Sequence, residues 1–463
     1  MRSNIVFGVL VCMLAAFGYF MTRTRQPHAI PVHATDASVT DAGVADDAGV
    51  DGGADAGRVL ARPIRVVGTG WDLLAPAIVA NGGRARGATS AFSDAHVDVT
   101  FTIAEDEADA EKQLARGGAD GAGADVAVMS LPAFVDSYER LRALEPEVFL
   151  VVGWSRGQDA IFGAKDASLL KSRADEPKLA NRGSNAALAL SLFAVDEAGT
   201  PLGRVKITPD PKNTTFSSLT RPFEIEASSS KVLLSTADAS HLVPIVAVAP
   251  RGFIGTQGDV LKMWSKVWFA SEDSFKKDVP GSTRMLAKDP GAPEPAALLA
   301  RLGQMKAATV RDNVKWLGLS GRPAATLATL VPRTFRLWKD SGRATMPMPD
   351  TPLVTDSIFA ALVRAEPSLV ESADPVKIST GTDRAILKAR VLDPKADEAA
   401  IVREVAFLAG IFERSTLRVS TKTPGSTSKV IERAYGTYDI AQGRLVADKS
   451  PAENTATIEV LSP

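Results

Sequence analysis

Three helix starts in this sequence offer backbone amides to a bound molecule: Gly70–Asp72, Ser130–Ala133 and Gly183–Ala186. Each follows an extended apolar segment and opens a helical pattern, so its first amides have no partner inside the helix. Such amides, together with the helix dipole, favour anions or carbonyl groups. Glycines in and before these segments let a ligand approach the backbone closely. The pattern predicts three loops that converge on one binding site.

The predicted ligand-binding residues come from these loops and from one arginine. Trp71 is expected to supply an apolar wall, and Arg156 a cationic grip for an acidic ligand. Asp72 stands in a first helical turn, where a carboxylate interacts with the helix dipole itself, and we expect it to point outward. An inward Asp72 would repel nitrate or sulfonate and suit an amine or a polyol. For each residue alone, helix capping or turn formation is the competing interpretation. The full set is Gly70, Trp71, Asp72, Ser130, Arg156, Gly183, Ser184 and Asn185.

Ser155 lies in a second candidate site, because "GWSRG" matches the G-x-S-x-G pattern of a hydrolase nucleophile elbow. Such an elbow needs a sturdy helix directly behind the serine, and the segment that follows is interrupted by Gly163. The imidazole would have to come from His241, with Asp238 only three residues before it. A serine hydrolase is therefore kept only as a minor alternative, and we expect no enzyme activity.

Several other chemistries are disfavoured by the residue content. Cys12 is the only cysteine and the four histidines are scattered, so we expect neither a disulfide nor a metal site, and no cofactor. The third glycine position of a dinucleotide fingerprint falls on Leu73, which disfavours a nucleotide loop at "GTGW". A net charge of −1 with scattered basic residues gives no electrostatic footprint for nucleic acid.

Alternating strands and helices must position these residues. From Pro63 onward the order is strand, helix, strand, helix, strand, and a second alternating series begins at Lys178. After Arg251 the sequence changes to amphipathic helices, typical of a chain that leaves one domain and returns to it. The alternation predicts an α/β fold with mainly parallel sheets, in which ligands bind beyond the carboxyl ends of the strands.

Taken together, several segments between Pro63 and Val354 resemble a known family. They are "RVVGTGWDLLAPAI", "GADVAVMSLPAFVDSYERL", "VVGWSRGQDAIFGA", "ANRGSNAALALSLFAVDEAG" and "FRLWKDSG". The resemblance is to the nitrate/sulfonate/bicarbonate class of ABC-transporter substrate-binding proteins. It implies a two-lobe clamp of the type II periplasmic-binding fold over 61–354. The first lobe would span about 61–154 and 250–354, and the second about 155–249. It also implies a small-molecule ligand, with anions among the candidates, and an ABC permease as the partner.

The N-terminal part predicts a membrane anchor, with a cleaved signal peptide as the alternative, followed by a tether. Residues 1–26 include the uncharged run Ile5–Met21, long enough to span a bilayer, which needs roughly 17–25 residues. Residues 27–60 are rich in Asp, Ala and Gly, which predicts a disordered linker. Arg23 and Arg25 would keep the following chain in the cytoplasm. The family resemblance instead implies folded domains in the periplasm, or otherwise outside the cytoplasm.

The C-terminal part, 370–463, predicts a separate small α/β domain in β-α-β-α-β order. It faintly resembles the outer membrane protein A-like domain, and Arg433-Ala434 matches that family's second helix. The stretch "STKTPGS" lacks the aspartate of the family's Thr-Asp pair, and "AENTATIEV" lacks its arginines. Those positions hold peptidoglycan in the family, so we expect that binding to be lost.

These observations predict a membrane-tethered, extracytoplasmic solute-binding protein that closes around its ligand by a hinge motion. The alternative from another class is a cell-envelope scaffold that keeps the clamp fold and binds no small molecule.

Overall fold

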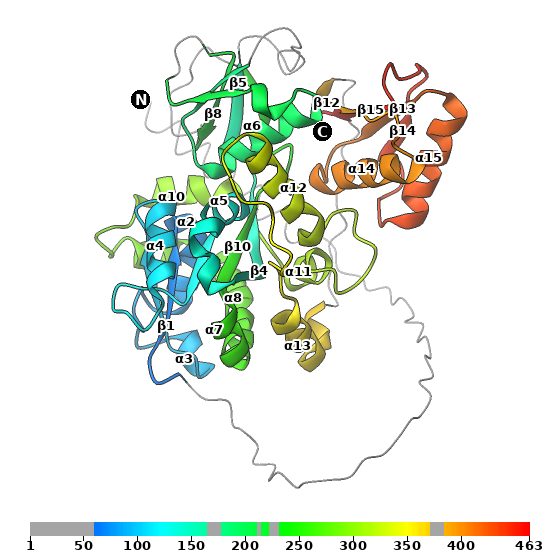
Figure 1. Cartoon of the computed structure of the whole chain (residues 1–463). Helices are drawn as coiled ribbons and strands as arrows, with labels where there is room; N and C mark the ends of the chain where they lie inside the picture. Colours follow the sequence, from blue (N-terminus) through cyan, green and yellow to red (C-terminus); the bar gives the residue numbers. More distant parts are fainter. Residues whose placement is uncertain (1–59, 164–176, 211–213, 222–230, 371–383) are drawn as a thin grey trace, which may run out of the picture. The chain divides into compact units, whose positions relative to one another are not determined.

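The computed structural model describes residues 60–163, 177–210, 214–221, 231–370 and 384–463 (Figure 1). The predicted anchor and nearly all of the predicted linker lie outside these ranges. Among the described residues, no helix has the length and apolar character needed to cross a membrane.

The first sheet has six strands in the order β11-β4-β10-β3-β1-β2. Its strands are β1 (Ile64–Gly68), β2 (Val99–Ile103), β3 (Val126–Ser130), β4 (Pro146–Ser155), β10 (Pro244–Pro250) and β11 (Met305–Ala307). β1 is parallel to β2 and β3, whereas β10 runs antiparallel to both β3 and β4. Every residue of β3 and β4 is buried, as expected for strands covered by helices on both faces. We expected a mainly parallel sheet, but only two of its five strand pairings are parallel, because β10 and β11 run opposite to the other four strands.

The helices that connect the first strands begin at the end of the sheet where the parallel strands end. They are α2 (Trp71–Ala80), the short α3 (Ala91–Asp94), α4 (Glu107–Arg116) and α5 (Leu131–Leu141). The first helix of the predicted alternation corresponds to α2, whose interior includes Pro76.

The second sheet has five strands in the order β7-β6-β8-β5-β9. Its strands are β5 (Asp159–Gly163), β6 (Lys178–Asn181), β7 (Lys206–Thr208), β8 (Phe216–Thr220) and β9 (Lys231–Ser235), and α6 (Asn185–Glu197) packs on it. β6 is parallel to β7 and β8, while β5 is antiparallel to β8 and β9. Two of its four strand pairings are parallel and two are antiparallel, so this sheet is also mixed. The chain crosses between the two sheets twice, from β4 to β5 and from β9 to β10.

The segment after β10 is mostly helical and returns to the first sheet. It contains α7 (Arg251–Thr256), α8 (Gly258–Lys277), α9 (Val279–Leu286), α10 (Pro295–Gly303), α11 (Val310–Trp316), α12 (Leu327–Asp340) and α13 (Ser357–Ala365). We expected no strand in this region, but β11 pairs with the end of β4. Short 3-10 helices lie at Arg142–Leu144, Leu202–Arg204 and Pro367–Val370.

The third sheet is formed by the C-terminal part of the chain. Its order is β12-β15-β13-β14, with strands β12 (Ala385–Val391), β13 (Leu417–Thr421), β14 (Leu445–Ala447) and β15 (Ala456–Leu461). Two helices pack on it, α14 (Glu398–Ile411) and α15 (Pro424–Thr437). The predicted β-α-β-α-β order is present, with β14 as an additional short strand before the last one.

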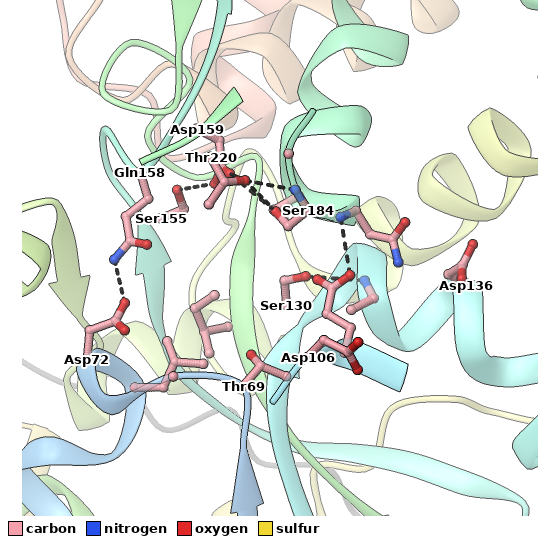
Figure 2. A pocket seen from close by; sticks show the side chains of 18 of the residues that line it. Thr69, Asp72, Asp106, Ser130, Asp136, Ser155, Gln158, Asp159, Ser184 and Thr220 are labelled. Atoms are coloured by element: carbon pink, nitrogen blue, oxygen red, sulfur yellow. Dashed lines mark hydrogen bonds between the residues drawn. The ribbon is translucent and has the colours of Figure 1, made fainter. Parts of the chain in front are cut away.

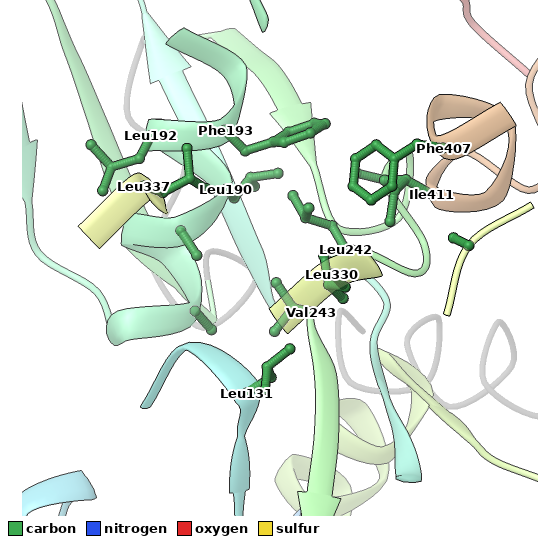
Figure 3. Packing of buried hydrophobic residues seen from close by; sticks show 14 of the residues in the cluster. Leu131, Leu190, Leu192, Phe193, Leu242, Val243, Leu330, Leu337, Phe407 and Ile411 are labelled. Carbon is green, nitrogen blue, oxygen red and sulfur yellow. The ribbon is translucent and has the colours of Figure 1, made fainter. Parts of the chain in front are cut away.

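Buried side chains of α6, α12 and α14 form one continuous hydrophobic cluster (Figure 3). Phe193 of α6 packs against Phe407 of α14, with ring centroids 6.5 Å apart, and against Phe412, at 6.2 Å. Leu330 and Leu337 of α12 belong to the same cluster. Burial of aromatic and leucine side chains is a main source of folding stability, so the three sheets share one core at this junction.

Arg333 of α12 adds an ionic contact to this junction. Its guanidinium donates two hydrogen bonds to the Glu404 carboxylate of α14, at 3.0 and 2.6 Å, and lies 3.6 Å from the centroid of the Phe407 ring. It also reaches Glu197 of α6, at 3.5 Å. Burial raises the pKa of Glu197 well above its usual range, and Glu404 raises it further. Arg333 therefore links α12 to α6, which packs on the second sheet, and to α14, which packs on the third.

Candidate functional site

A cavity of about 490 Å³ lies between the first two sheets (Figure 2). The first sheet contributes the loop after β1, the start of α4 and the start of α5. The second contributes the start of β5, the start of α6 and the end of β8. Ligands of α/β proteins bind in this kind of position, beyond strand ends and at helix starts. Of the eight predicted residues, six line the cavity: Gly70, Asp72, Ser130, Gly183, Ser184 and Asn185.

Asp72 points into the cavity, so the expectation that it faces outward was wrong. Its side chain is buried and accepts a hydrogen bond of 2.6 Å from Gln158 Nε2. Its other oxygen lies 3.3 Å from Arg221 Nη2. Both partners belong to the second sheet's side of the cavity, and they satisfy a carboxylate that would otherwise be costly to bury. A side chain at Gly70 would lie 2.6 Å from Asp72 Oδ1, so glycine is required for this arrangement.

Trp71 is not among the residues that line the cavity, contrary to expectation. It is 6% exposed and belongs to the hydrophobic core that lies under α2. The guanidinium of Arg84 lies 6.0 Å from its ring centroid. The first turn of α2 therefore directs Trp71 toward the core and Asp72 toward the cavity.

Arg156 also lies outside the cavity lining, so its predicted role as a cationic grip has no support from the geometry. Burial lowers its pKa, and the nearby Glu413 carboxylate of the C-terminal part opposes that effect. Its backbone amide donates to Gln304 O at 2.8 Å. The arginines that do line the cavity are Arg140 and Arg221.

Ser130 lines the cavity and also caps a helix. It is the last residue of β3, and its Oγ accepts a hydrogen bond of 3.2 Å from the backbone amide of Ala133 in α5. This is the capping role that we considered as the competing interpretation.

The start of α6 shows a different arrangement. The Ser184 side chain makes no capping hydrogen bond to the helix. Its Oγ lies 2.8 Å from Thr220 Oγ1 and 3.4 Å from Asp159 Oδ1. The amide of Asn185, the first residue of α6, donates instead to Glu107 Oε2 across the cavity, at 3.3 Å. A side chain at Gly183 would lie 2.7 Å from the amide nitrogen of Thr220, which explains the glycine there.

Asp159 is the centre of a buried hydroxyl network next to this helix start. It is 2% exposed and accepts hydrogen bonds from Ser155, at 2.7 Å, and from Thr220, at 2.8 Å. Burial raises the pKa of Asp159, while the hydroxyl donors lower it. Ser155 is therefore a donor in this network.

His241 is not placed to activate Ser155. Burial lowers the pKa of His241 to about 4, so the ring is neutral near pH 7. Its Nδ1 lies 3.1 Å from the carbonyl oxygen of Gly410, and its Nε2 lies 3.4 Å from Lys306 Nζ. A carbonyl only accepts, so Nδ1 carries the proton and Nε2 accepts. Asp238 accepts from the amide and hydroxyl of Ser235. The three residues of the hydrolase alternative do not form a triad.

The ionisable side chains that line the cavity are mostly acidic. Besides Asp72, two more of these carboxylates pair with an arginine. Arg140 donates to Glu111 at 2.6 Å and to Asp136 at 3.4 Å. Burial raises the pKa of Glu107 to about 7, and the neighbouring carboxylates of Asp159, Asp136 and Asp106 raise it too. The lining has six carboxyl groups, Asp72, Asp106, Glu107, Glu111, Asp136 and Asp159, and two guanidinium groups, Arg140 and Arg221.

Sequence reasoning missed most of the side chains that cross or fill the cavity. Gln158 and Asp159 follow the "GWSRG" segment directly, and Arg221 directly follows a strand that we did not predict. Glu107 follows a helix-capping aspartate and looks like an ordinary helix-start residue. Within the described ranges, no group of histidine, cysteine, aspartate and glutamate side chains is arranged to hold a metal ion.

No protein-family model and no curated protein matches this sequence. Among solved structures, the chain is similar to the alkanesulfonate-binding protein SsuA from Xanthomonas axonopodis pv. citri bound to MOPS. The identity is 13%, with 63% of this chain and 98% of that chain covered and a TM-score of 0.43. It is also similar to the periplasmic nitrate-binding protein NrtA from Synechocystis PCC 6803, at 11% identity, 66% and 90% coverage and a TM-score of 0.42. A third is the zinc-bound ligand-binding component of an ABC-type import system from Staphylococcus aureus, at 13% identity, 65% and 99% coverage and a TM-score of 0.44. At this level of similarity the ligand has to be argued from the cavity itself.

Proposed function

We propose that this protein is a solute-binding clamp that holds a small polar molecule between its first two sheets. The observation that carries the proposal is the cavity at the strand ends, with Asp72 of one side hydrogen-bonded to Gln158 and ion-paired with Arg221 of the other. A site whose walls come from two sheets joined by two crossovers can open and close around a ligand. No covalent step is required of any residue in it.

The ligand that fits this lining is a cation, such as an amine, or a polyhydroxylated molecule. Six carboxyl groups face two guanidinium groups, and both guanidinium groups are already paired with carboxylates. An entering anion would therefore meet net repulsion in a partly desolvated space. Hydroxyl or ammonium donors would find acceptors in Asp106, Glu107 and Asp136. The anionic ligand that we considered from sequence is not favoured.

The proposal extends to location and partners. The uncharged N-terminal run and the acidic linker support a membrane-anchored protein with its folded part outside the cytoplasm. An ABC permease is the partner that such a clamp would serve. For the C-terminal part we keep the degenerate outer membrane protein A-like interpretation, with no role in binding peptidoglycan.

A thermal-unfolding panel tests the proposed function. Amines, polyols, sugars and small anions are added to the full-length protein, and a true ligand at a hundredfold excess over its dissociation constant stabilises by about 2.7 kcal/mol. We expect the largest rise in Tm from amines or polyols. Asp72→Asn should weaken the response to amines, whereas Asp259→Asn, a charge removal at the exposed start of α8, should leave it unchanged.

Two outcomes contradict the proposal at different levels. A flat response to the whole panel would favour the alternative, a cell-envelope scaffold with a clamp fold and no small ligand. A response to sulfate or nitrate that exceeds every amine and polyol would refute the ligand class and leave the clamp in place.

A further inference from the structure

A carboxylate of the protein itself, that of Glu107, lies at the start of α6. α6 has thirteen residues, Asn185–Glu197, and its first amide donates to Glu107 Oε2 at 3.3 Å. The Ser184 hydroxyl, which would normally cap the helix, is directed to Thr220 and Asp159 instead. A carboxylate from the opposite side of the cavity therefore takes the position that a free anion would take at this helix start.

Glu107 reaches this position because of where its own helix begins. It is the first residue of α4, directly after the N-cap Asp106, whose carboxylate accepts from the Asp109 amide. Asp106 thus caps α4, which leaves the Glu107 carboxylate free to extend across the cavity. Asp136 and Asp159 are close enough to act on its charge, so a second anion at the same place would be repelled by several carboxylates.

We propose that Glu107 is a specificity-determining residue: its carboxylate occupies the α6 helix start and excludes anionic solutes from the cavity. This inference rests on the proposed function, because it concerns which ligands the same cavity accepts. Removing the side chain frees the Asn185 amide and leaves the nearby Ser184 hydroxyl beside it. The positive end of the helix dipole is then available to an inorganic anion.

The test is calorimetric titration of four full-length proteins with sodium sulfate and sodium nitrate at constant ionic strength and pH 7.5. They are the wild type, Glu107→Ala, Glu107→Gln and Glu398→Ala. Glu398 is the matched control, since it is also the first residue of a helix that an aspartate caps, and its side chain is exposed. We expect Glu107→Ala to bind sulfate about tenfold more tightly than the wild type, and Glu398→Ala to match the wild type.

If the alanine variant does not fold, Glu107→Gln still tests whether the charge of Glu107 excludes sulfate. Its amide oxygen still accepts from Asn185, but its charge is gone, so sulfate binding must still exceed that of the wild type. Equal sulfate affinity in the wild type and in the folded Glu107 variants overturns the inference. A wild-type response to amines or polyols in the thermal panel then leaves the proposed function standing. If no protein responds to any compound, the proposed function fails as well.

Discussion

Glu107 should make the stability of this protein depend on pH in a way that one substitution removes. Burial and three neighbouring carboxylates raise its pKa from 4.5 to about 7 in the folded protein. The folded state therefore binds this proton more tightly than the unfolded state does. The protonated carboxyl contributes its full stability below pH 4.5, and that contribution is lost as the pH rises to about 7.

The size of the effect follows from the same two values. At 1.36 kcal/mol per pH unit, the interval from 4.5 to about 7 corresponds to at most about 3.4 kcal/mol. The carboxyl is partly exposed, so solvent screening reduces the expected cost of the charged form to about 1–3 kcal/mol at pH 8. Glu107→Gln keeps the acceptor for the Asn185 amide and cannot ionise. We therefore expect it to be more stable than the wild type at pH 8 and about equal at pH 4.5.

Urea unfolding of both proteins at pH 4.5, 6, 7 and 8, followed by circular dichroism, measures this difference. Glu398→Gln removes an exposed carboxyl from the same helix position, and its difference from the wild type should stay constant from pH 6 to pH 8. A difference between Glu107→Gln and the wild type that does not change between pH 4.5 and pH 8 would refute the reasoning. It would mean that the Glu107 carboxyl is solvated as freely in the folded state as in the unfolded state.

Three further experiments test the contacts that hold the parts of the chain together. Asp72→Ala removes the carboxylate partner of Arg221 and one of the two acceptors of the Gln158 amide, and we expect a loss of about 1–3 kcal/mol in the free energy of unfolding, measured with urea. A double-mutant cycle of Arg333→Met with Glu404→Gln should give a coupling energy of about 0.5–3 kcal/mol, and a value of zero would show that the ion pair adds nothing. Gly410→Val places a Cβ atom 2.5 Å from a side chain just before α12, so its Tm should fall, whereas Gly436→Ala has open space around it and should not lower the Tm.

Apart from β11, the strands of the first sheet could be predicted, because their composition alone identifies them. β3 and β4 are continuous apolar runs, and each is followed by residues that start a helix or a turn. β5 was missed, since "QDAIFGAKDASLL" reads as an interrupted helix. Its strand conformation comes from pairing with β8 and β9, which lie far along the chain. Local patterns do not contain that information.

The helix starts that line the cavity could also be predicted, but the side chains that cross it could not. Asp72 faces inward because its carboxylate accepts hydrogen bonds from Gln158 and Arg221. These partners are 86 and 149 residues away in the sequence. Nothing near Asp72 in the sequence distinguishes this from an outward helix-start carboxylate. The same holds for Glu107, whose acceptor role depends on the amide of Asn185, 78 residues further on.

The C-terminal part also bears on how the cavity opens, because it contacts the segments that join the first two sheets. The amide of His241, just before β10, donates to Ile411 O at 3.1 Å, and the His241 ring bonds to Gly410 O. Arg333 joins α12 to both α6 and α14. A change in the angle between the first two sheets must therefore shift contacts with the third. Packed cores resist gradual deformation, so the closure that we propose would have to move the third sheet together with one of the other two, or work against its packing.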